Sequence, residues 1–194
     1  MKLVFRMGTA ILMAGSLVFF FACGGEGGES GSYSEDSAET EAPQQQESNR
    51  GTASATFGDA SVSVDYGRPK LEGRDMLAQA TDGMVWRMGM NEATTFTTDA
   101  DLTFGDTVVP AGEYSLFMKK VGDGWELIFN SQTGQWGTEH DPAQDVASVP
   151  MMMSENDASV EAFTIEVMAN DETSGALSAM WGMAKITCDF TVGG

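Results

Sequence analysis

The 194-residue sequence has one histidine, two cysteines and only ten lysines and arginines. A zinc or copper centre that needs two histidine ligands from one chain is therefore excluded. The 29 acidic residues far outnumber the bases and give a formal net charge of −19. Because this excess of negative charge repels phosphate backbones, we expect no nucleic-acid partner.

A long apolar run is present only at the N-terminus, from Ala10 to Ala22, behind Lys2 and Arg6. This pattern is typical of a secretory signal and is shorter than a comfortable membrane span. The pair Ala22-Cys23 at its end resembles a bacterial lipobox, in which the cysteine is acylated and becomes the new N-terminus. We therefore expect residues 1–22 to be a lipoprotein signal peptide and Cys23 to carry the lipid. An uncleaved helical anchor is the alternative.

These features predict a cell-envelope protein attached to a membrane through its N-terminal lipid. We expect the outer membrane, with the domain in the periplasm or at the cell surface. Residues 23–50 are rich in Gly, Ser, Glu and Gln, include seven acids and have few apolar residues. Such a segment buries too little surface to fold, so we expect a disordered acidic tether.

Residues 51–194 are expected to form one folded domain. It has 22 acids and seven bases, so most of the negative charge lies on the domain. This predicts a domain that is more stable at high salt, where the repulsion between like charges is screened.

Cys188 has no partner within the chain if Cys23 is acylated, which predicts the absence of an intramolecular disulfide. It lies in Lys185–Phe190, where apolar and polar residues alternate. We expect a small, partly buried strand residue here rather than a nucleophile, because no basic residue is visibly paired with it.

Short segments of alternating polarity, separated by turn residues, predict an all-β antiparallel β-sandwich of roughly nine to eleven strands with one short helix. The helix is expected at Arg74–Ala80, and a hairpin connection at Val108–Glu113. The strands are expected at Ala60–Tyr66, Ala93–Thr98, Leu102–Phe104, Thr107–Val109, Glu113–Met118, Trp125–Phe129, Val160–Met168 and Leu177–Phe190.

An ordered set of motifs runs along this domain: Tyr66-Gly67-Arg68-Pro69, Gly73-Arg74, Val85-Trp86-Arg87, Gly89, Asn91-Glu92-Ala93-Thr94-Thr95, Pro110–Phe117, Phe129-Asn130 and Gln135-Trp136-Gly137. Together they resemble the bacterial family catalogued as domain of unknown function 2911, from about Ser54 to Phe190. The resemblance implies a secreted or lipid-anchored protein with an all-β domain, and no established activity. This chain differs in having Met90 where alanine is usual and Ser148 where a basic residue is expected.

Arg68, Arg74 and Arg87 are three of the domain's seven bases and lie within 20 residues. One interpretation is an anion clamp, since guanidinium groups form bidentate bonds to carboxylate or phosphate. The other, which we favour, is internal pairing with Asp65, Glu72, Glu92 or backbone carbonyls. Further residues expected to line the same cleft, which would suit an anionic or carbohydrate ligand, are Trp86, Asn91, Glu92, Asn130 and Trp136.

Other chemistry has less support in the sequence. His140 is expected to be a solvated loop residue, and no Gly-x-Ser-x-Gly elbow accompanies it. Met151-Met152-Met153 follows Pro150 at an expected strand end, where core filling is a better interpretation than Cu(I) binding. Asp99 and other turn acids lack the spacing of a calcium loop. We therefore expect no metal and no cofactor.

Two classes of function remain open. The first is a non-catalytic binding or structural module of the envelope, with a surface lined by Arg, Trp and Asn. The alternative is a hydrolase of an envelope glycan or peptide, whose carboxylates the sequence does not identify. Copper binding is a third and weaker hypothesis.

Overall fold

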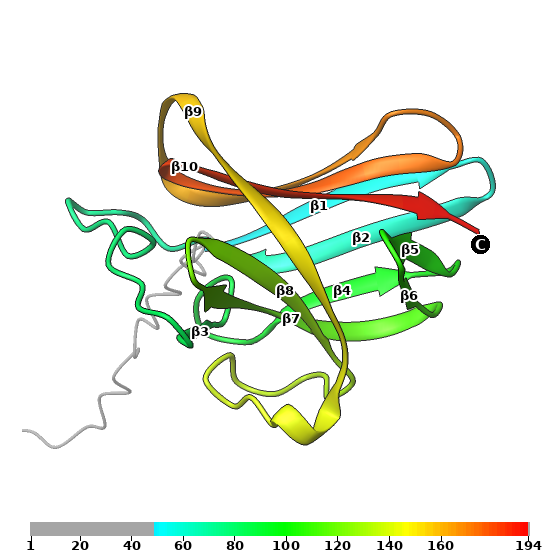
Figure 1. The fold of residues 1–194 in the computed structure, drawn as a ribbon, viewed down its shortest axis with the longest axis horizontal. Helices are drawn as coiled ribbons and strands as arrows, with labels where there is room; N and C mark the ends of the chain where they lie inside the picture. The colour runs from blue at the N-terminus through cyan, green and yellow to red at the C-terminus, as the bar shows by residue number, and fades with distance from the viewer. Residues whose placement is uncertain (1–48, 194) are drawn as a thin grey trace, which may run out of the picture. The chain divides into compact units, whose positions relative to one another are not determined.

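The computed structural model describes residues 49–193. The expected signal peptide, Cys23 and nearly all of the expected tether lie outside this range. Within it the chain forms ten β-strands and one turn of 3-10 helix, η1 (Figure 1). The elements are β1 Arg50–Phe57, β2 Ala60–Gly67, β3 Val85–Trp86, β4 Thr94–Thr98, β5 Leu102–Phe104, β6 Thr107–Val109, β7 Gly112–Val121, β8 Gly124–Asn130, η1 Pro142–Gln144, β9 Asp145–Ala169 and β10 Ser174–Val192.

The strands pair antiparallel in the order β1-β2-β4-β7-β8-β9-β10-β5-β6, and β3 pairs with β7. The long strand β9 joins two layers, because residues 145–151 pair with β8 and residues 152–169 pair with β10. Figure 1 shows β9 running diagonally across the molecule between these neighbours. The expected all-β antiparallel class is confirmed.

The first layer consists of β1, β2, β4, β7 and β8. The alternation of buried and exposed side chains along its strands shows which face is turned to the core. In β2 the side chains of Val62, Val64 and Tyr66 are buried, while Ser61, Ser63 and Asp65, which alternate with them, are not. The run Tyr114–Met118 in β7 is different, because every residue in it is buried. Its outward side chains therefore lie beneath another part of the chain.

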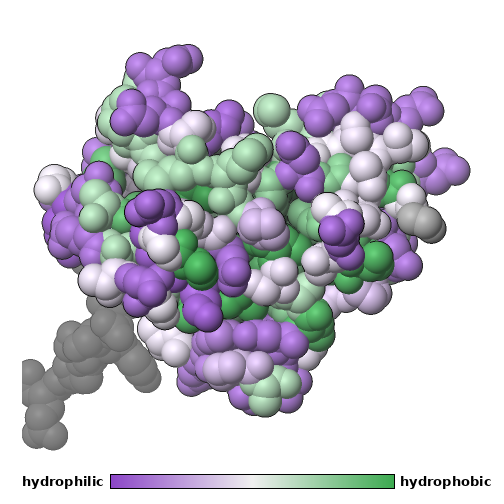
Figure 2. Space-filling model, in the orientation of Figure 1, coloured by the Kyte–Doolittle hydropathy of each residue, from purple (hydrophilic) through white to green (hydrophobic). Residues whose placement is uncertain are grey.

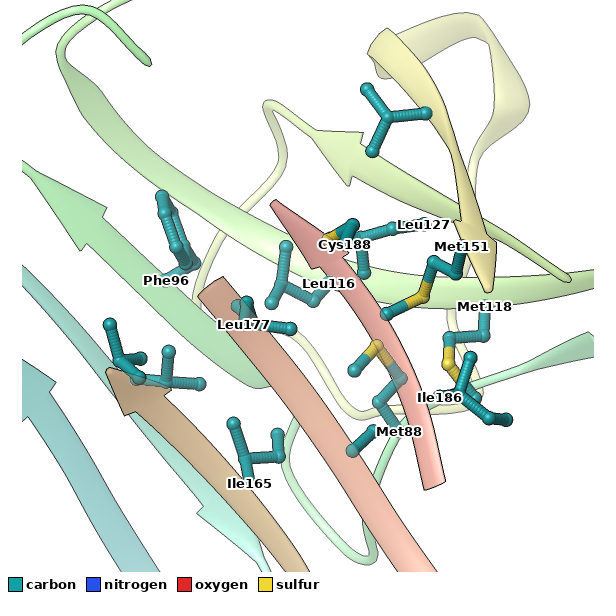
Figure 3. Close-up of a cluster of buried hydrophobic side chains, with 14 of the residues drawn as sticks. Met88, Phe96, Leu116, Met118, Leu127, Met151, Ile165, Leu177, Ile186 and Cys188 are labelled. Atoms are coloured by element: carbon teal, nitrogen blue, oxygen red, sulfur yellow. The ribbon is translucent and has the colours of Figure 1, made fainter. Parts of the chain in front are cut away.

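The core lies between the layers and is rich in aromatic rings. Phe129 of β8 lies 5.3 Å from Phe96 of β4 and 5.3 Å from Phe104 of β5, measured between ring centroids. Phe190 of β10 lies 5.4 Å from Phe104. Figure 3 shows aliphatic and sulfur side chains of β7, β8, β9 and β10 in the same core.

Three details differ from the expectations. Arg74–Ala80 forms turns, not a helix, because only Leu77 of this short segment is buried and one buried residue does not offset the cost of helix nucleation. Val108–Glu113 is not a hairpin, since β6 pairs with β5 and β7 with β4. Met151-Met152-Met153 lies within β9, where the strand changes partners, rather than at a strand end.

The charged residues lie mainly at the surface. Figure 2 shows one face, on which hydrophilic residues predominate at the edges and apolar residues are interspersed between them. Among residues 49–193, no helix is long and apolar enough to span a membrane.

Candidate functional site

Two long connections carry most of the predicted site residues. The first, residues 68–93 between β2 and β4, is called the arginine segment here because Arg68, Arg74 and Arg87 belong to it. The second, residues 131–144 between β8 and β9, is called the covering loop because it covers the outward face of β7 and β8. Long connections of this kind within compact domains often carry function.

The backbone of the arginine segment is held in unusual conformations. Glu72, Met88 and Asn91 have φ values of 48°, 48° and 63°, and they are the described non-glycine residues with positive φ. Met88 is fully buried, and its carbonyl accepts a hydrogen bond of 2.7 Å from the Thr94 hydroxyl. Concentration of such conformations in one segment is typical of functional regions held by their surroundings.

Buried polar side chains hold the covering loop. Asn130, which is fully buried, donates from Nδ2 to the Asp141 carbonyl and to Oδ1 of Asp145, both at 2.8 Å. Gln135 donates to the Ser115 hydroxyl at 3.1 Å, beneath the loop. Asn130 was expected to line a binding surface, but here it fixes the loop from below.

The two connections meet at backbone hydrogen bonds. The Gly137 amide donates to the Asn91 carbonyl at 2.8 Å, and the Ala93 amide donates to the Gln135 carbonyl at 3.1 Å. Glu92 and Trp136 form an antiparallel bridge, which leaves the Trp136 side chain 47% exposed. The structure therefore places Asn91, Glu92 and Trp136 side by side.

Arg87 lies where the connections meet, in a cavity of about 380 Å³ that we call the outer cavity. The Arg87 Nε donates to the Gly89 carbonyl at 3.2 Å, and no carboxylate among residues 49–193 pairs with this guanidinium. The Arg87 side chain packs against Gly137, since a Cβ at Gly137 would lie 2.9 Å from Arg87 Cδ. The residues that line the cavity are Val85, Trp86, Arg87, Phe117, Gly137, Thr138 and His140.

His140 is not the solvated loop residue that the sequence predicted. Its side chain is only 14% exposed, and its ring lies 4.5 Å from that of Phe117 at an interplanar angle of 40°. Its Nε2 lies 2.8 Å from Oδ1 of Asp145. The loop sequence did not reveal this position, because Phe117 is supplied by β7 and is distant in the sequence.

A smaller cavity of about 280 Å³ adjoins the outer cavity and shares Val85 and His140 with it. Its charged lining residues are Lys119, Glu126 and Asp145. The Ser148 hydroxyl, at the position where a basic residue was expected, donates to Oε2 of Glu126 at 3.0 Å.

Arg68 and Arg74 line a different cavity, of about 300 Å³, together with Lys70. The expected single clamp of three arginines is therefore divided between two cavities. Lys70 was not among the predicted site residues, although its position two residues after Arg68 predicts that the two side chains share a face if the segment is extended.

Two of the three acids that were expected to pair with these arginines form ion pairs with another arginine, Arg50. Arg50, the last residue of the expected tether, is the first residue of β1. It forms an ion pair with Asp65 and a second one, of 3.3 Å, with Glu92. Of the predicted pairs with acids, Arg74 with Glu72 is present, at 3.2 Å. Arg68 and Arg87 instead donate to the backbone carbonyls of Phe163 and Gly89, which were the other predicted partners.

The remaining candidate residues have structural surroundings. Cys188 is buried in the core. Burial, with a smaller contribution from the negative charge of Asp189, raises the pKa of its thiol to about 12. Asp99 accepts hydrogen bonds from the backbone amide and hydroxyl of Ser61, which lower its pKa. Within residues 49–193, no group of three or more His, Cys, Asp or Glu side chains is arranged to hold a metal ion.

Comparison with known proteins places the chain in a family. No curated protein and no solved structure matches it. The family model described as Protein of unknown function (DUF2911) matches residues 48–190, which is most of the chain and nearly all of the described region. The motifs noted in the sequence fall within this range, and the chain therefore belongs to the DUF2911 family.

Proposed function

We propose that this protein is a lipid-anchored protein of the cell envelope whose β-sandwich binds a small anionic or carbohydrate ligand in the outer cavity. Support for the location comes from the charged and apolar N-terminal pattern that ends in Ala22-Cys23. Mass spectrometry of the N-terminal peptide tests it. We expect a lipid-modified Cys23, and an unmodified Cys23 would contradict the anchor.

The observation that carries the binding proposal is the half-buried guanidinium of Arg87, which has no carboxylate partner among the described residues. A cation in this state gains free energy from an anion that enters the cavity. The Phe117 and His140 rings supply an apolar wall beside it, and Thr138 supplies a hydroxyl. This combination suits a ligand with a carboxylate and one apolar face, such as the C–H face of an acidic sugar or a side chain at the C-terminus of a peptide.

The substitution Arg87→Met tests this role, with Lys185→Met as the matched loss of one positive charge on β10. Saturation-transfer NMR with glucuronate, N-acetylglucosamine and a free dipeptide identifies the ligand class. We expect the signals of the acidic probes to disappear in Arg87→Met and to persist in Lys185→Met. A lower free energy of unfolding without any loss of ligand signal would show that Arg87 is structural.

Hydrolysis is the second candidate, and one observation favours it. Glu126, Asp145 and His140 line the same small cavity beside Arg87, so two carboxylates and a proton-accepting ring adjoin the proposed binding site. Turnover of a peptidoglycan fragment that Glu126→Gln abolishes without loss of binding would favour an enzyme. Binding without turnover favours the non-catalytic module.

A further inference from the structure

The cavity lined by Arg68, Lys70 and Arg74, called the basic cavity below, has an unusual charge for this protein. Residues 49–193 contain 22 acids and eight bases. Three of those eight bases line this one cavity, and Glu72 is the single carboxylate in its lining. The basic cavity is thus a positive site in a strongly negative domain.

Two of the three cations are aligned by the strand pairing that follows β2. The Phe163 amide of β9 donates to the Pro69 carbonyl at 2.8 Å, and the Leu71 amide donates to the Glu161 carbonyl at 2.9 Å. Lys70 forms an antiparallel bridge with Ala162 between these bonds. Because side chains two residues apart in an extended chain share a face, Arg68 and Lys70 extend to the same side.

A tight turn brings the third cation back to them. The Arg74 amide donates to the Leu71 carbonyl at 2.8 Å, and the central residues Glu72 and Gly73 have φ values of 48° and 76°. Two consecutive positive φ values close a type I′ turn and reverse the chain. Glu72 is held in this conformation by its amide, which donates to Oε1 of Glu161 at 3.1 Å.

Arg68 is positioned without being neutralised. Its Nε and Nη2 donate to the Phe163 carbonyl and to the Thr164 hydroxyl, both at 3.3 Å and both uncharged acceptors. A guanidinium has five N–H groups, so these two bonds leave others for a ligand. The stem of Arg68 crosses β1 at Gly51, where an added Cβ would lie 2.7 Å from Arg68 Cδ.

We propose that the basic cavity binds a phosphate group. Among the lining side chains, three cations and one carboxylate leave an excess of positive charge, which the Glu161 carboxylate on the Glu72 amide reduces but does not cancel. A net positive site of this kind suits a phosphate group, which is negatively charged at neutral pH. Arg68 supplies a planar fork of donors and Lys70 a compact charge. Among residues 49–193, Arg74 is paired only with Glu72, and both side chains are about two-thirds exposed, at 66% and 67%. Such a pair is weak, so Arg74 is able to exchange Glu72 for a phosphate oxygen.

This proposal does not depend on the proposed function, because the basic cavity and the outer cavity share no lining residue. The same chemistry suits a free phosphomonoester or the phosphodiester of a lipid headgroup. Asn49, the first described residue, also lines the basic cavity.

Isothermal titration of the full-length protein in neutral detergent, at constant ionic strength, tests the proposal. The probes are inorganic phosphate, glycerol 3-phosphate, and glycerophosphoglycerol as a soluble lipid headgroup, with acetate as the anion control. We expect Arg68→Gln and Lys70→Gln each to raise the Kd for phosphate about tenfold. Lys185→Gln removes the same charge outside the cavity and is expected to change it less than about twofold.

Further variants separate position from charge. Arg68→Lys keeps the charge but loses the planar fork, so an intermediate Kd is expected. Gly51→Ala displaces Arg68 and is expected to weaken phosphate binding while Arg68 remains. Near-UV circular dichroism checks that each variant is folded.

Tighter binding of glycerol 3-phosphate than of glycerophosphoglycerol assigns a free monoester, and the reverse order assigns a headgroup. Equal Kd values in wild type and Arg68→Gln, or acetate binding as tight as phosphate binding, would overturn the proposal.

Discussion

The arginine segment and the covering loop are both attached to the β-sandwich, but by different kinds of contact. Both are long connections on the first layer, and both line the outer cavity. The arginine segment is attached by buried apolar side chains and by backbone pairing, with Met88 and Leu77 in the core. The covering loop is attached by buried amides, above all Asn130 and Gln135. Apolar attachment leaves Arg68, Lys70 and Arg74 of the first segment exposed and Arg87 partly exposed, whereas polar attachment fixes the second connection as a wall of the outer cavity.

Removal of the apolar attachment is expected to have the largest effect. Met88→Ala empties a fully buried site, and we expect the free energy of unfolding to fall by about 3 kcal/mol. Met76→Ala, in the same segment but 43% exposed, is the control and is expected to change it little. Urea denaturation measures both, and similar losses in the two variants would refute apolar attachment at Met88.

Removal of the polar attachment comes next. Asn130→Ala leaves the Asp141 carbonyl and the Gln132 amide without their partner, so we expect a loss of about 2 kcal/mol. Hydrogen exchange is expected to accelerate in residues 131–144 and not in residues 68–80. Uniform acceleration across the domain would contradict a local attachment.

The dependence of stability on NaCl distinguishes the two attachments from the repulsion between the domain's charges. Neither Met88 burial nor the Asn130 amide relies on long-range charge, so the losses caused by the two substitutions are expected to be independent of NaCl. The Tm of the wild type is expected to rise by about 3 °C between about 0.05 M and about 1 M NaCl as repulsion is screened. A Tm that is flat across this range would count against charge repulsion.

The smallest expected effect on Tm is the loss of the Asp99 hydrogen bonds in acid. Asp99 lies outside both connections. The Ser61 amide and then its hydroxyl lower the pKa of Asp99, so this carboxylate stabilises the fold above its ordinary pKa. That contribution is lost as the pH falls below about 4. Thermal melts from neutral to acid pH are expected to show a smaller acid-induced decrease in Tm for Asp99→Asn than for wild type. A larger decrease in the variant would reverse the sign of this linkage.

Local patterns in the sequence predicted the strands whose faces differ in polarity, such as β2 and β4. The first half of β9 was not predicted, because Pro150 and Met151-Met152-Met153 interrupt the alternation there. The strands that pair with β6 and β7 could not be predicted from the sequence either, because a turn with Pro110 and Gly112 suits both a hairpin and a change of layer. Motif spacing, by contrast, identified the family over most of the domain.

The candidate site was predicted in composition but not in arrangement. Arg68 and Arg87 lie in separate cavities because residues 69–71 pair with β9, a contact between segments about ninety positions apart in the chain. The burial of His140 depends on Phe117, and the neutralisation of Asp65 depends on Arg50. Each of these contacts joins residues that are distant in sequence, where local patterns carry no information.

The double pairing of β9 has a consequence for folding. Because one strand hydrogen-bonds to β8 over its first residues and to β10 over the rest, neither layer can separate without disrupting a strand of the other. The Tyr66 hydroxyl, bonded to the Ile165 carbonyl, joins positions 99 residues apart and depends on the same strand. Such distant pairings slow folding, and the shared strand makes unfolding a single cooperative transition. Partial melting that exposes the edges of one layer is thereby suppressed, which lowers the risk of aggregation.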